Sequence, residues 1–399
     1  MEEKMQRFFD TYVNYHGFLR SPAGDLRPML YDAMNRGGIS RVELADVGKM
    51  VKRAIDVRGA STLRTKHAVR KAFENLQSGN PRRAIGELVA GFFWSDPNNV
   101  ERLARHLNRE GSHTFSLGLE FKASTAHVFS GQFDGRPSIF KITPSFRSEP
   151  NAFDLSEHLT GLPVSRMLHS QATPLVDSHL IVSSPLSGNL AVSAIGRGAS
   201  VSEVYSGMGG VLAKLHGVVV SPLIQNLLSG HNRQWPQVAA SALKRLDGLA
   251  EALRFDAATT RSIRNVLSRS LAPAGLDSVL HDDYHEENVL VDERGRVSGL
   301  LDLGGAALGD PMYDLAKAQY YAQRAERLYD FKGAAAALQE GYKKNCALTP
   351  EAKSRLAHYV LAVSVALASP QLKYPEKKPI ARELILNALD LAKKTVSHQ

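Results

Sequence analysis

The chain has 399 residues, and its 49 lysines and arginines outnumber 40 aspartates and glutamates, which gives a formal charge of +9. A hydrophobic fraction of 43% and a charged fraction of 22% are ordinary for a globular protein, and the length predicts two or three domains. The single cysteine, Cys346, excludes an internal disulfide framework and any cysteine-rich metal module.

No segment is predicted to enter a membrane. The first residues, MEEKMQRFFD, carry acids and aromatics and lack the apolar core of a signal peptide. The longest apolar run, residues 360–368, is interrupted by Ser364 and is far shorter than the roughly 20 residues of a membrane span. We therefore expect a soluble, cytoplasmic protein.

The positive charge is concentrated in the N-terminal quarter. Residues 1–110 hold 19 basic and 13 acidic side chains, so they carry 19 − 13 = +6 of the total +9. The basic residues lie in mixed-sign segments such as VGKMVKRAIDVR, with no block of five like charges and no alternation with aromatics. This distribution is typical of a solvated helical face, and binding to nucleic acid is not expected.

The same N-terminal quarter is predicted to be helical. Apolar residues recur at helical spacing over residues 5–13, and Ser40 with Glu43 forms a capping box at the start of a second such segment. Glycine- and proline-containing turn signals separate about five helices. We expect an all-α accessory domain over residues 1–110, which is a candidate docking surface for a protein partner.

Short β-prone runs separated by glycines begin near Gly111. The pair Asp134-Gly135 between two apolar runs is a strong hairpin signal. Further segments are predicted as a helix over 151–161 and as strands over 162–170 and 178–186. This order predicts a small, mostly antiparallel sheet with one inserted helix. From residue 200 the chain is helix-rich, apart from strands and turns over 279–310.

Polar and acidic side chains gather in the turns of residues 279–316. Asp283 and Asn288 lie five residues apart on one predicted loop, and Asp302 closes the second strand of the hairpin that follows. Two carboxylates and an amide supply the oxygen ligands that Mg²⁺ takes, and Mg²⁺ needs few protein ligands when it also binds phosphates. The spacing matches the template for phosphoryl transfer.

Three motifs in this stretch resemble the aminoglycoside phosphotransferase/choline kinase family, which is related to protein kinases. They are His281-x-Asp283-x4-Asn288, the LDLG of residues 301–304, and the GDPMYDLA of residues 309–316. Their order and spacing are much more specific than any one motif. The resemblance implies a bilobal α+β fold, with a small antiparallel β lobe over 111–187 and a large helical lobe over 188–399.

The resemblance extends upstream and covers roughly residues 112–395. Residues 212–216, LAKLH, resemble the helix that precedes the catalytic loop, and residues 181–188 resemble the strand and linker between the lobes. Lys141, in the run FKI, is similar to the phosphate-binding lysine of the family. Glu149 is similar to the glutamate that pairs with this lysine, and Glu157 is an alternative candidate for the same role.

The resemblance implies a role for each of these residues. Asp283 would accept a hydrogen bond from the substrate hydroxyl and act as the catalytic base. Asn288 and Asp302 would bind Mg²⁺ between the phosphates of ATP. Lys141 would hold the α- and β-phosphates, and Glu149 would fix its ammonium group. Positioning and charge neutralisation then carry the catalysis.

Two further features concern the nucleotide and the metal. Backbone groups around Ser184 and Leu186 would meet the adenine edge. The chain departs from the family in having no glycine-rich phosphate loop, since residues 119–130 read LEFKASTAHVFS. It also has Asp282 where the family usually has glycine, and this extra carboxylate would either deepen the metal site or point into solvent.

Other interpretations of the polar residues are structural or metal-binding. His281 and His285, four residues apart among acids, would form a transition-metal cluster on a helix, but the flanking strand and turn signals favour a loop. We expect His281 to brace the loop and His216 to be a packed histidine at a helix end. We expect Asp310 and Asp314 to be structural as well.

The sequence therefore predicts an ATP- and Mg²⁺-dependent phosphotransferase that moves the γ-phosphoryl group to a hydroxyl of a small molecule or protein. The alternative is a non-catalytic nucleotide-binding pseudokinase whose N-terminal helices dock a partner. The acceptor stays open between antibiotic, metabolite and protein, because the C-terminal helices offer both charge signs, as at Glu340, Lys343 and Lys344.

Overall fold

The computed structural model describes two compact units. The described residues are 113–121, 127–144, 154–172, 178–271, 277–372 and 374–396, with residues 108 and 275 and the backbone at 20–21 and 24–25. One unit contains the described residues up to Arg147 together with Leu168–Ser183, and the other contains Ser148–Met167 and Ser184–Gln399. The domain limits expected from the sequence, 111–187 and 188–399, stay predictions.

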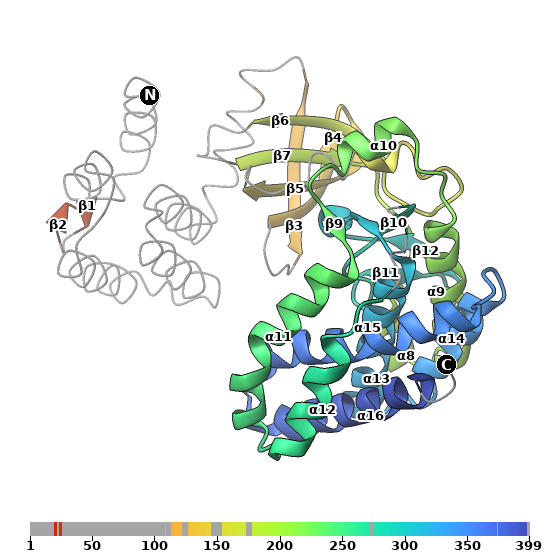
Figure 1. Ribbon diagram of the computed structural model, residues 1–399. Helices are drawn as coiled ribbons and strands as arrows, with labels where there is room; N and C mark the ends of the chain where they lie inside the picture. The colour runs from red at the N-terminus through yellow and green to blue at the C-terminus, as the bar shows by residue number, and fades with distance from the viewer. Residues whose placement is uncertain are drawn as a thin grey trace. The chain divides into compact units, whose positions relative to one another are not determined.

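The first unit contains a five-stranded sheet in the order β3-β4-β5-β7-β6 (Figure 1). Its strands are β3 (Phe115–Phe121), β4 (His127–Phe133), β5 (Arg136–Pro144), β6 (Met167–Ala172) and β7 (Ser178–Ser183). The pairs β3/β4, β4/β5 and β5/β7 are antiparallel. The small antiparallel sheet expected from the sequence is confirmed.

The hairpin between β4 and β5 turns at Asp134-Gly135, as expected. Both residues have positive φ, 49° and 74°, which is the geometry of the two-residue turn that matches strand twist. The Asp134 carboxylate also accepts a hydrogen bond from the Thr114 N–H at 2.8 Å, so it ties the turn to the chain just before β3.

One face of this sheet carries an aromatic and aliphatic core. Its buried members are Phe115, Phe129, Phe133, Phe140, Ile142, Leu180 and Val182. Because side chains alternate along a strand, Lys141 lies on the opposite face of β5, between two core residues in sequence. In the sheet Lys141 is paired with Val128 and Ile181.

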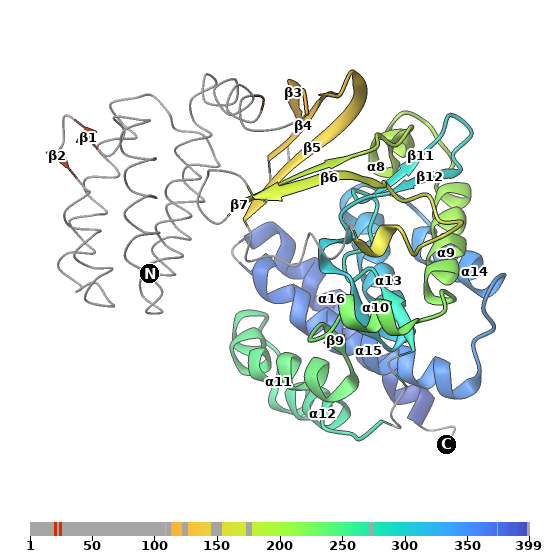
Figure 2. The ribbon, with the colours of Figure 1, turned by 90° about the horizontal axis from the view of Figure 1, so that it is seen from above.

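The second unit is mainly helical (Figure 2). Its helices are α8 (Ala191–Gly196), α9 (Val201–His216), α10 (Pro222–Leu227), α11 (Trp235–Ala252), α12 (Ala257–Leu267), α13 (Pro311–Leu328), α14 (Ala334–Lys343), α15 (Pro350–Ala368) and α16 (Lys378–Val396), with short 3₁₀ turns at Leu303–Gly305, Ser369–Gln371 and Pro375–Lys377. A helix-rich segment after residue 200 is therefore confirmed.

The described part of the second unit also contains six short strands, of which the last four lie in the segment of about 279–310 expected from the sequence, whereas the first two were not expected. They are β8 (Asn189–Leu190), β9 (Asn232–Arg233), β10 (Ser278–Leu280), β11 (Val289–Val291), β12 (Val297–Leu300) and β13 (Ala307–Gly309). They form two three-stranded sheets, β10-β13-β9 and β12-β11-β8. The loop between β10 and β11 is the segment that holds Asp283 and Asn288.

The apolar run of residues 360–368 lies in α15, which contacts α11, α13 and α16. Most residues of α15 are buried, including Leu361 and Val365, so the run is the centre of the helical core. Among the described residues, no helix combines the length and apolar character that crossing a membrane requires.

Several expected elements differ from the structure or lie outside the described residues. Only residues 154–156 of the helix expected over 151–161 are described as helical, and the strand expected over 162–170 begins at Met167. The expected helices of residues 1–110 lie outside the described part. The exception is a two-stranded ladder that pairs Arg20 with Asp25, around a predicted turn.

Helices α9 and α14 pack so closely that glycine is required at their crossing. A Cβ atom on Gly341 would lie 1.9 Å from the Ser206 carbonyl oxygen, and one on Gly209 would lie 2.0 Å from the Leu338 carbonyl oxygen. Real Cβ atoms do not approach backbone this closely, so either alanine would force the helices apart.

We predict that Gly341→Ala lowers the stability of the protein by about 2 kcal/mol or more, because overpacking strains a rigid core. Gly248→Ala in α11 is the matched control, since a Cβ there meets nothing within 4 Å. That control should gain up to about 1 kcal/mol from helix propensity. Thermal melting of the full chain measures both, and equal melting temperatures would contradict the close packing.

Candidate active site

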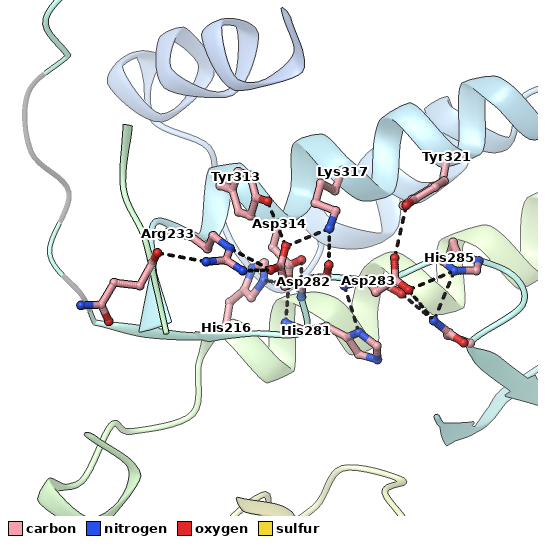
Figure 3. A network of polar contacts seen from close by, with 12 residues as sticks. His216, Arg233, His281, Asp282, Asp283, His285, Tyr313, Asp314, Lys317 and Tyr321 are labelled. Atoms are coloured by element: carbon pink, nitrogen blue, oxygen red, sulfur yellow. Dashed lines mark hydrogen bonds and ion pairs between the residues drawn. The ribbon is translucent and has the colours of Figure 1, made fainter. Parts of the chain in front are cut away.

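The loop between β10 and β11 is held by one buried carboxylate, that of Asp314 in the first turn of α13 (Figure 3). Asp314 accepts hydrogen bonds from the backbone N–H groups of His281, at 2.7 Å, and Asp282, at 3.0 Å. The His216 Nε2 atom, at the end of α9, lies 3.1 Å from the same carboxylate. Two helices and the loop therefore meet at one charge. His216 and Asp314 have the structural contacts that the sequence predicts for them.

The charge on Asp314 is compensated. Burial by itself would raise the pKa of this carboxyl, but the hydrogen bond and charge of His216, together with His281, lower it below its usual value. The other ring nitrogen of His216 lies 2.8 Å from the Tyr342 hydroxyl. Asp314 is thus an ionised anchor inside the protein.

His281 braces the loop from inside, as the sequence predicts. Its Nδ1 atom accepts a hydrogen bond from the Asp283 N–H at 3.3 Å, and its Nε2 atom donates to the Leu301 carbonyl at 2.9 Å. Burial lowers the pKa of His281, so the ring is neutral and both nitrogens are used. The ring therefore has no nitrogen left to ligate a transition metal.

Asp283 presents its carboxylate at the open side of the loop, and 42% of the side chain is exposed. Its Oδ1 atom accepts a hydrogen bond from the Tyr321 hydroxyl at 3.2 Å, and its Oδ2 atom accepts one from the Asn288 amide at 3.3 Å. His285 Nε2 lies 3.6 Å from the same Oδ2. Asp283 and Asn288, which the sequence predicts to act together, are therefore in direct contact.

The surroundings keep Asp283 ionised. Desolvation raises the pKa of this carboxyl, but the hydrogen bond and charge of His285, with the charge of Lys317, lower it to about 2. Burial and the charge of Asp283 also raise the pKa of Tyr321, so its hydroxyl keeps its proton and remains a donor.

Asn288 and Asp302 are brought near each other by strand pairing. The Leu301 N–H donates to the Asn288 carbonyl at 2.9 Å, and Asp302 directly follows Leu301. Asp302 is exposed and has a φ of 58°, which turns the chain into the 3₁₀ segment that follows. The Asn288 side-chain nitrogen donates to the Asp283 backbone carbonyl at 2.9 Å, which leaves the amide oxygen as the potential metal ligand.

These donors fit Mg²⁺ and do not fit a transition metal. An amide oxygen and an exposed carboxylate are hard oxygen ligands, and Mg²⁺ completes its shell with water and phosphate. In the described part of the chain, no group of three or more His, Cys, Asp or Glu side chains has the arrangement of a metal site. The histidine cluster considered for His281 and His285 is accordingly disfavoured.

Asp282 takes neither of the two positions considered from the sequence. Its side chain is 8% exposed and faces β9 and α13, away from both solvent and the expected metal. The guanidinium of Arg233 contacts Oδ2 at 2.8 and 2.7 Å. On the other side, Oδ1 accepts hydrogen bonds from the Lys317 ammonium at 2.8 Å and the Tyr313 hydroxyl at 2.9 Å.

Sequence reasoning missed the residues that support the loop from outside. Arg233 lies on the two-residue strand β9, which carries no local pattern that marks it. Tyr313, Lys317 and Tyr321 recur every four residues along α13, so they share one face of that helix. The four-residue spacing indicates a shared helix face, but it does not indicate that this face of α13 contacts the loop.

The sequence matches the family model described as "Phosphotransferase enzyme family" over residues 139–348, which is more than half of the chain. The chain belongs to this family. No curated protein sequence matches it.

Solved structures of phosphotransferases share the fold. Aminoglycoside phosphotransferase APH(4)-Ia is 14% identical, with a TM-score of 0.53 over 74% of this chain and 99% of that chain. A thermostable mutant of that enzyme, in ternary complex with ADP and hygromycin B, is also 14% identical, with a TM-score of 0.53 over 72% and 98%. Macrolide 2′-phosphotransferase MphH from Brachybacterium faecium is 19% identical, with a TM-score of 0.50 over 73% and 98%. The protein-kinase-like α+β fold expected from the sequence is thus confirmed for the described part.

The other predicted site residues of this phosphotransferase lie apart from the loop in sequence. Lys141 lies on β5 in the sheet unit, and Glu149 lies outside the described residues. Ser184 follows β7, and its backbone N–H and carbonyl already bond to Arg166 and Ser165. A hydrogen bond from the Ser184 N–H to adenine would have to replace its bond to Arg166, whereas the Ser184 carbonyl has a second lone pair. Leu186 lies two residues further along the linker.

We predict that Asp314→Asn lowers the free energy of unfolding by about 2 kcal/mol at pH 7, because a buried charged hydrogen-bond acceptor is lost. Asp314 has a lowered pKa, so its contribution is complete above the normal carboxyl pKa and is lost as the pH falls below it. The difference between wild type and variant should therefore shrink below about pH 4.

Urea denaturation at pH 7, 5 and 3.5 measures this difference. Asp390→Asn is the matched control, since Asp390 is exposed on α16. A difference between wild type and Asp314→Asn that stays constant with pH would contradict an ionised anchor.

We predict a second effect at Asp282, whose φ of 58° favours glycine. Asp282→Ala loses the contacts to Arg233 and Lys317 and keeps the strained backbone, whereas Asp282→Gly loses only the contacts. The alanine variant should be less stable than the glycine variant by about 1 kcal/mol, and both should be less stable than wild type. Melting temperatures test the order, and an alanine variant as stable as wild type would show that the ion pairs contribute nothing.

Proposed function

We propose that this protein is an ATP- and Mg²⁺-dependent kinase that transfers the γ-phosphoryl group to a hydroxyl of a small molecule. Its membership of the phosphotransferase family supports the reaction type. The observation that carries the proposal is the contact of Asp283 with Asn288 on one loop, with Asp302 directly after Leu301, whose N–H donates to the Asn288 carbonyl.

Asp283 would accept the hydrogen bond of the acceptor hydroxyl. With a pKa of about 2, this carboxylate is a weak base, so it orients the hydroxyl throughout and takes its proton only late in the reaction. Late proton transfer suits phosphoryl transfer, whose transition state is loose and needs little help from a strong nucleophile. The exposed part of the Asp283 side chain allows a substrate to reach it.

Asn288 and Asp302 would hold Mg²⁺, and Lys141 with Glu149 would hold the phosphates. Bound Mg²⁺-ATP would supply the phosphoryl group and neutralise the charge that builds up on it. Ser184 and Leu186 would lie near the adenine. The fixed Asn288 amide, tied to the Asp283 carbonyl, would keep its oxygen in place before the metal binds.

The acceptor would be a hydroxyl-bearing small molecule. APH(4)-Ia is described in complex with ADP and hygromycin B, and MphH is described as a macrolide phosphotransferase. Both act in the same fold, which supports a small-molecule acceptor more than a protein. A protein partner for residues 1–110 stays a prediction.

The competing proposal is a pseudokinase that binds nucleotide without turnover. The ionised, exposed carboxylate of Asp283 favours catalysis, because a protein that only binds nucleotide has no need of a base held open to an acceptor. Nucleotide binding without turnover would be its signature.

We predict that Asp283→Asn lowers phosphoryl transfer by about 10²- to 10⁴-fold, the range of a lost general base, while Mg²⁺-ATP still raises the melting temperature. Asp302→Asn should instead lose the Mg²⁺-dependent part of this thermal shift. Transfer from γ-labelled ATP to a panel of aminoglycosides, macrolides and hydroxylated metabolites measures turnover.

The exposed Asp390→Asn variant is again the control and should behave as wild type. A thermal shift without turnover on any acceptor would favour the pseudokinase. Absence of both thermal shift and turnover in the wild type would rule out a nucleotide-dependent enzyme.

A further inference from the structure

One oxygen of the proposed catalytic base is already bonded to a hydroxyl of the protein itself. Tyr321 donates its O–H to Asp283 Oδ1 at 3.2 Å, while Oδ2 faces Asn288 and His285 (Figure 3). The acceptor alcohol of the proposed reaction must donate an O–H to this same carboxylate. Tyr321 therefore makes the hydrogen bond that the substrate would make.

The Tyr321 ring contacts two neighbouring side chains. The His285 ring lies 4.8 Å from it between centroids, and the Arg324 guanidinium lies over it at 5.2 Å. His285 belongs to the catalytic loop, whereas Arg324 belongs to α13, as Tyr321 does. The phenol therefore contacts both the loop and its own helix. Its hydroxyl is already oriented toward Asp283, so little side-chain conformational entropy is lost when the hydrogen bond forms.

The rest of the helix face directs no other hydroxyl to Asp283. Tyr313 donates to Asp282, and Lys317 also pairs with Asp282. Residues spaced by four along α13 therefore contact two different sides of the loop. Tyr313 and Lys317 hold the support side of the loop, and Tyr321 contacts the side that would react.

We propose that Tyr321 is a positioning residue that takes the place of the acceptor hydroxyl on Asp283 and so suppresses the transfer of phosphate to water. The inference rests on the proposed kinase function. Water is the nucleophile that every kinase must exclude, and a water molecule needs the Asp283 carboxylate to orient it. The phenol withholds Oδ1 from water, and a tightly bound alcohol displaces or shares that hydrogen bond.

The reaction that Tyr321 would suppress is hydrolysis of ATP. In it, the bond from the γ-phosphorus to the bridging oxygen breaks, a bond from phosphorus to the water oxygen forms, and ADP leaves. The water proton passes to Asp283 and then to solvent, and the products are ADP and inorganic phosphate. A phenol in contact with Asp283 also lacks a competing role as a base, since its O–H is the donor of the bond.

The test is hydrolysis of Mg²⁺-ATP without any acceptor, measured as phosphate release by Tyr321→Phe. This change removes one oxygen and keeps the ring that contacts His285 and Arg324. We expect hydrolysis to rise by about threefold to tenfold, the factor that a typical intramolecular hydrogen bond supplies, with an unchanged melting temperature. With glycerol as a probe alcohol, the ratio of phosphate to glycerol phosphate should rise as well.

Tyr374→Phe is the matched control, because Tyr374 is an exposed tyrosine that stacks with Lys377 far along the sequence from the loop. It should hydrolyse ATP at the wild-type rate. If Tyr321→Phe hydrolyses ATP at or below the wild-type rate, Tyr321 only orients Asp283 or does nothing there, and the inference is wrong.

The thermal shift with Mg²⁺-ATP separates this failure from failure of the proposed function. A wild-type shift combined with no gain in Tyr321→Phe overturns the role of Tyr321 alone. A wild type that shows neither shift nor hydrolysis overturns the kinase proposal, and the role of Tyr321 falls with it.

Discussion

The buried carboxylate of Asp314 is the interaction on which the rest of the candidate site depends. It accepts the backbone N–H groups of His281 and Asp282, and it contacts His216 on a separate helix. A carboxylate without such partners would be very costly inside a protein, so helix α9, helix α13 and the loop must keep their relative places. The position of Asp283, one residue further, follows from this anchor.

The loop has a supporting side, which Asp282 faces, and an open side, which Asp283 faces. Asp282 points back to Arg233 and Lys317, and its positive φ reverses the direction of the chain, so that Asp283 faces outward. Two cations on Asp282 also place positive charge near Asp283, and Lys317 contributes to its low pKa. Asp282, which departs from the pattern expected for the family, therefore supports the proposed catalytic base.

The sequence predicts those parts of the site whose residues lie close together along the chain. The spacing of Asp283 and Asn288 on a loop between strands placed them in contact, and the Asp134-Gly135 pair placed the hairpin. It was insufficient for Arg233 and Tyr321, which are 49 and 38 residues from their partners, because such contacts depend on how helices pack. The roles expected for Lys141 and Glu149 stay predictions, and Glu149 lies outside the described residues.

The electrostatics of Asp283 indicate what kind of catalyst this loop can be. The Asp283 carboxylate, whose pKa His285 and Lys317 lower to about 2, has little affinity for a proton at neutral pH. In the proposed reaction it would not take the proton of a hydroxyl before the phosphoryl group departs, and it would act as a hydrogen-bond acceptor at every stage. Selectivity must then come from which hydroxyl occupies the carboxylate. In the proposed role, the Tyr321 phenol at one of its two oxygens would then bias the choice between water and an alcohol.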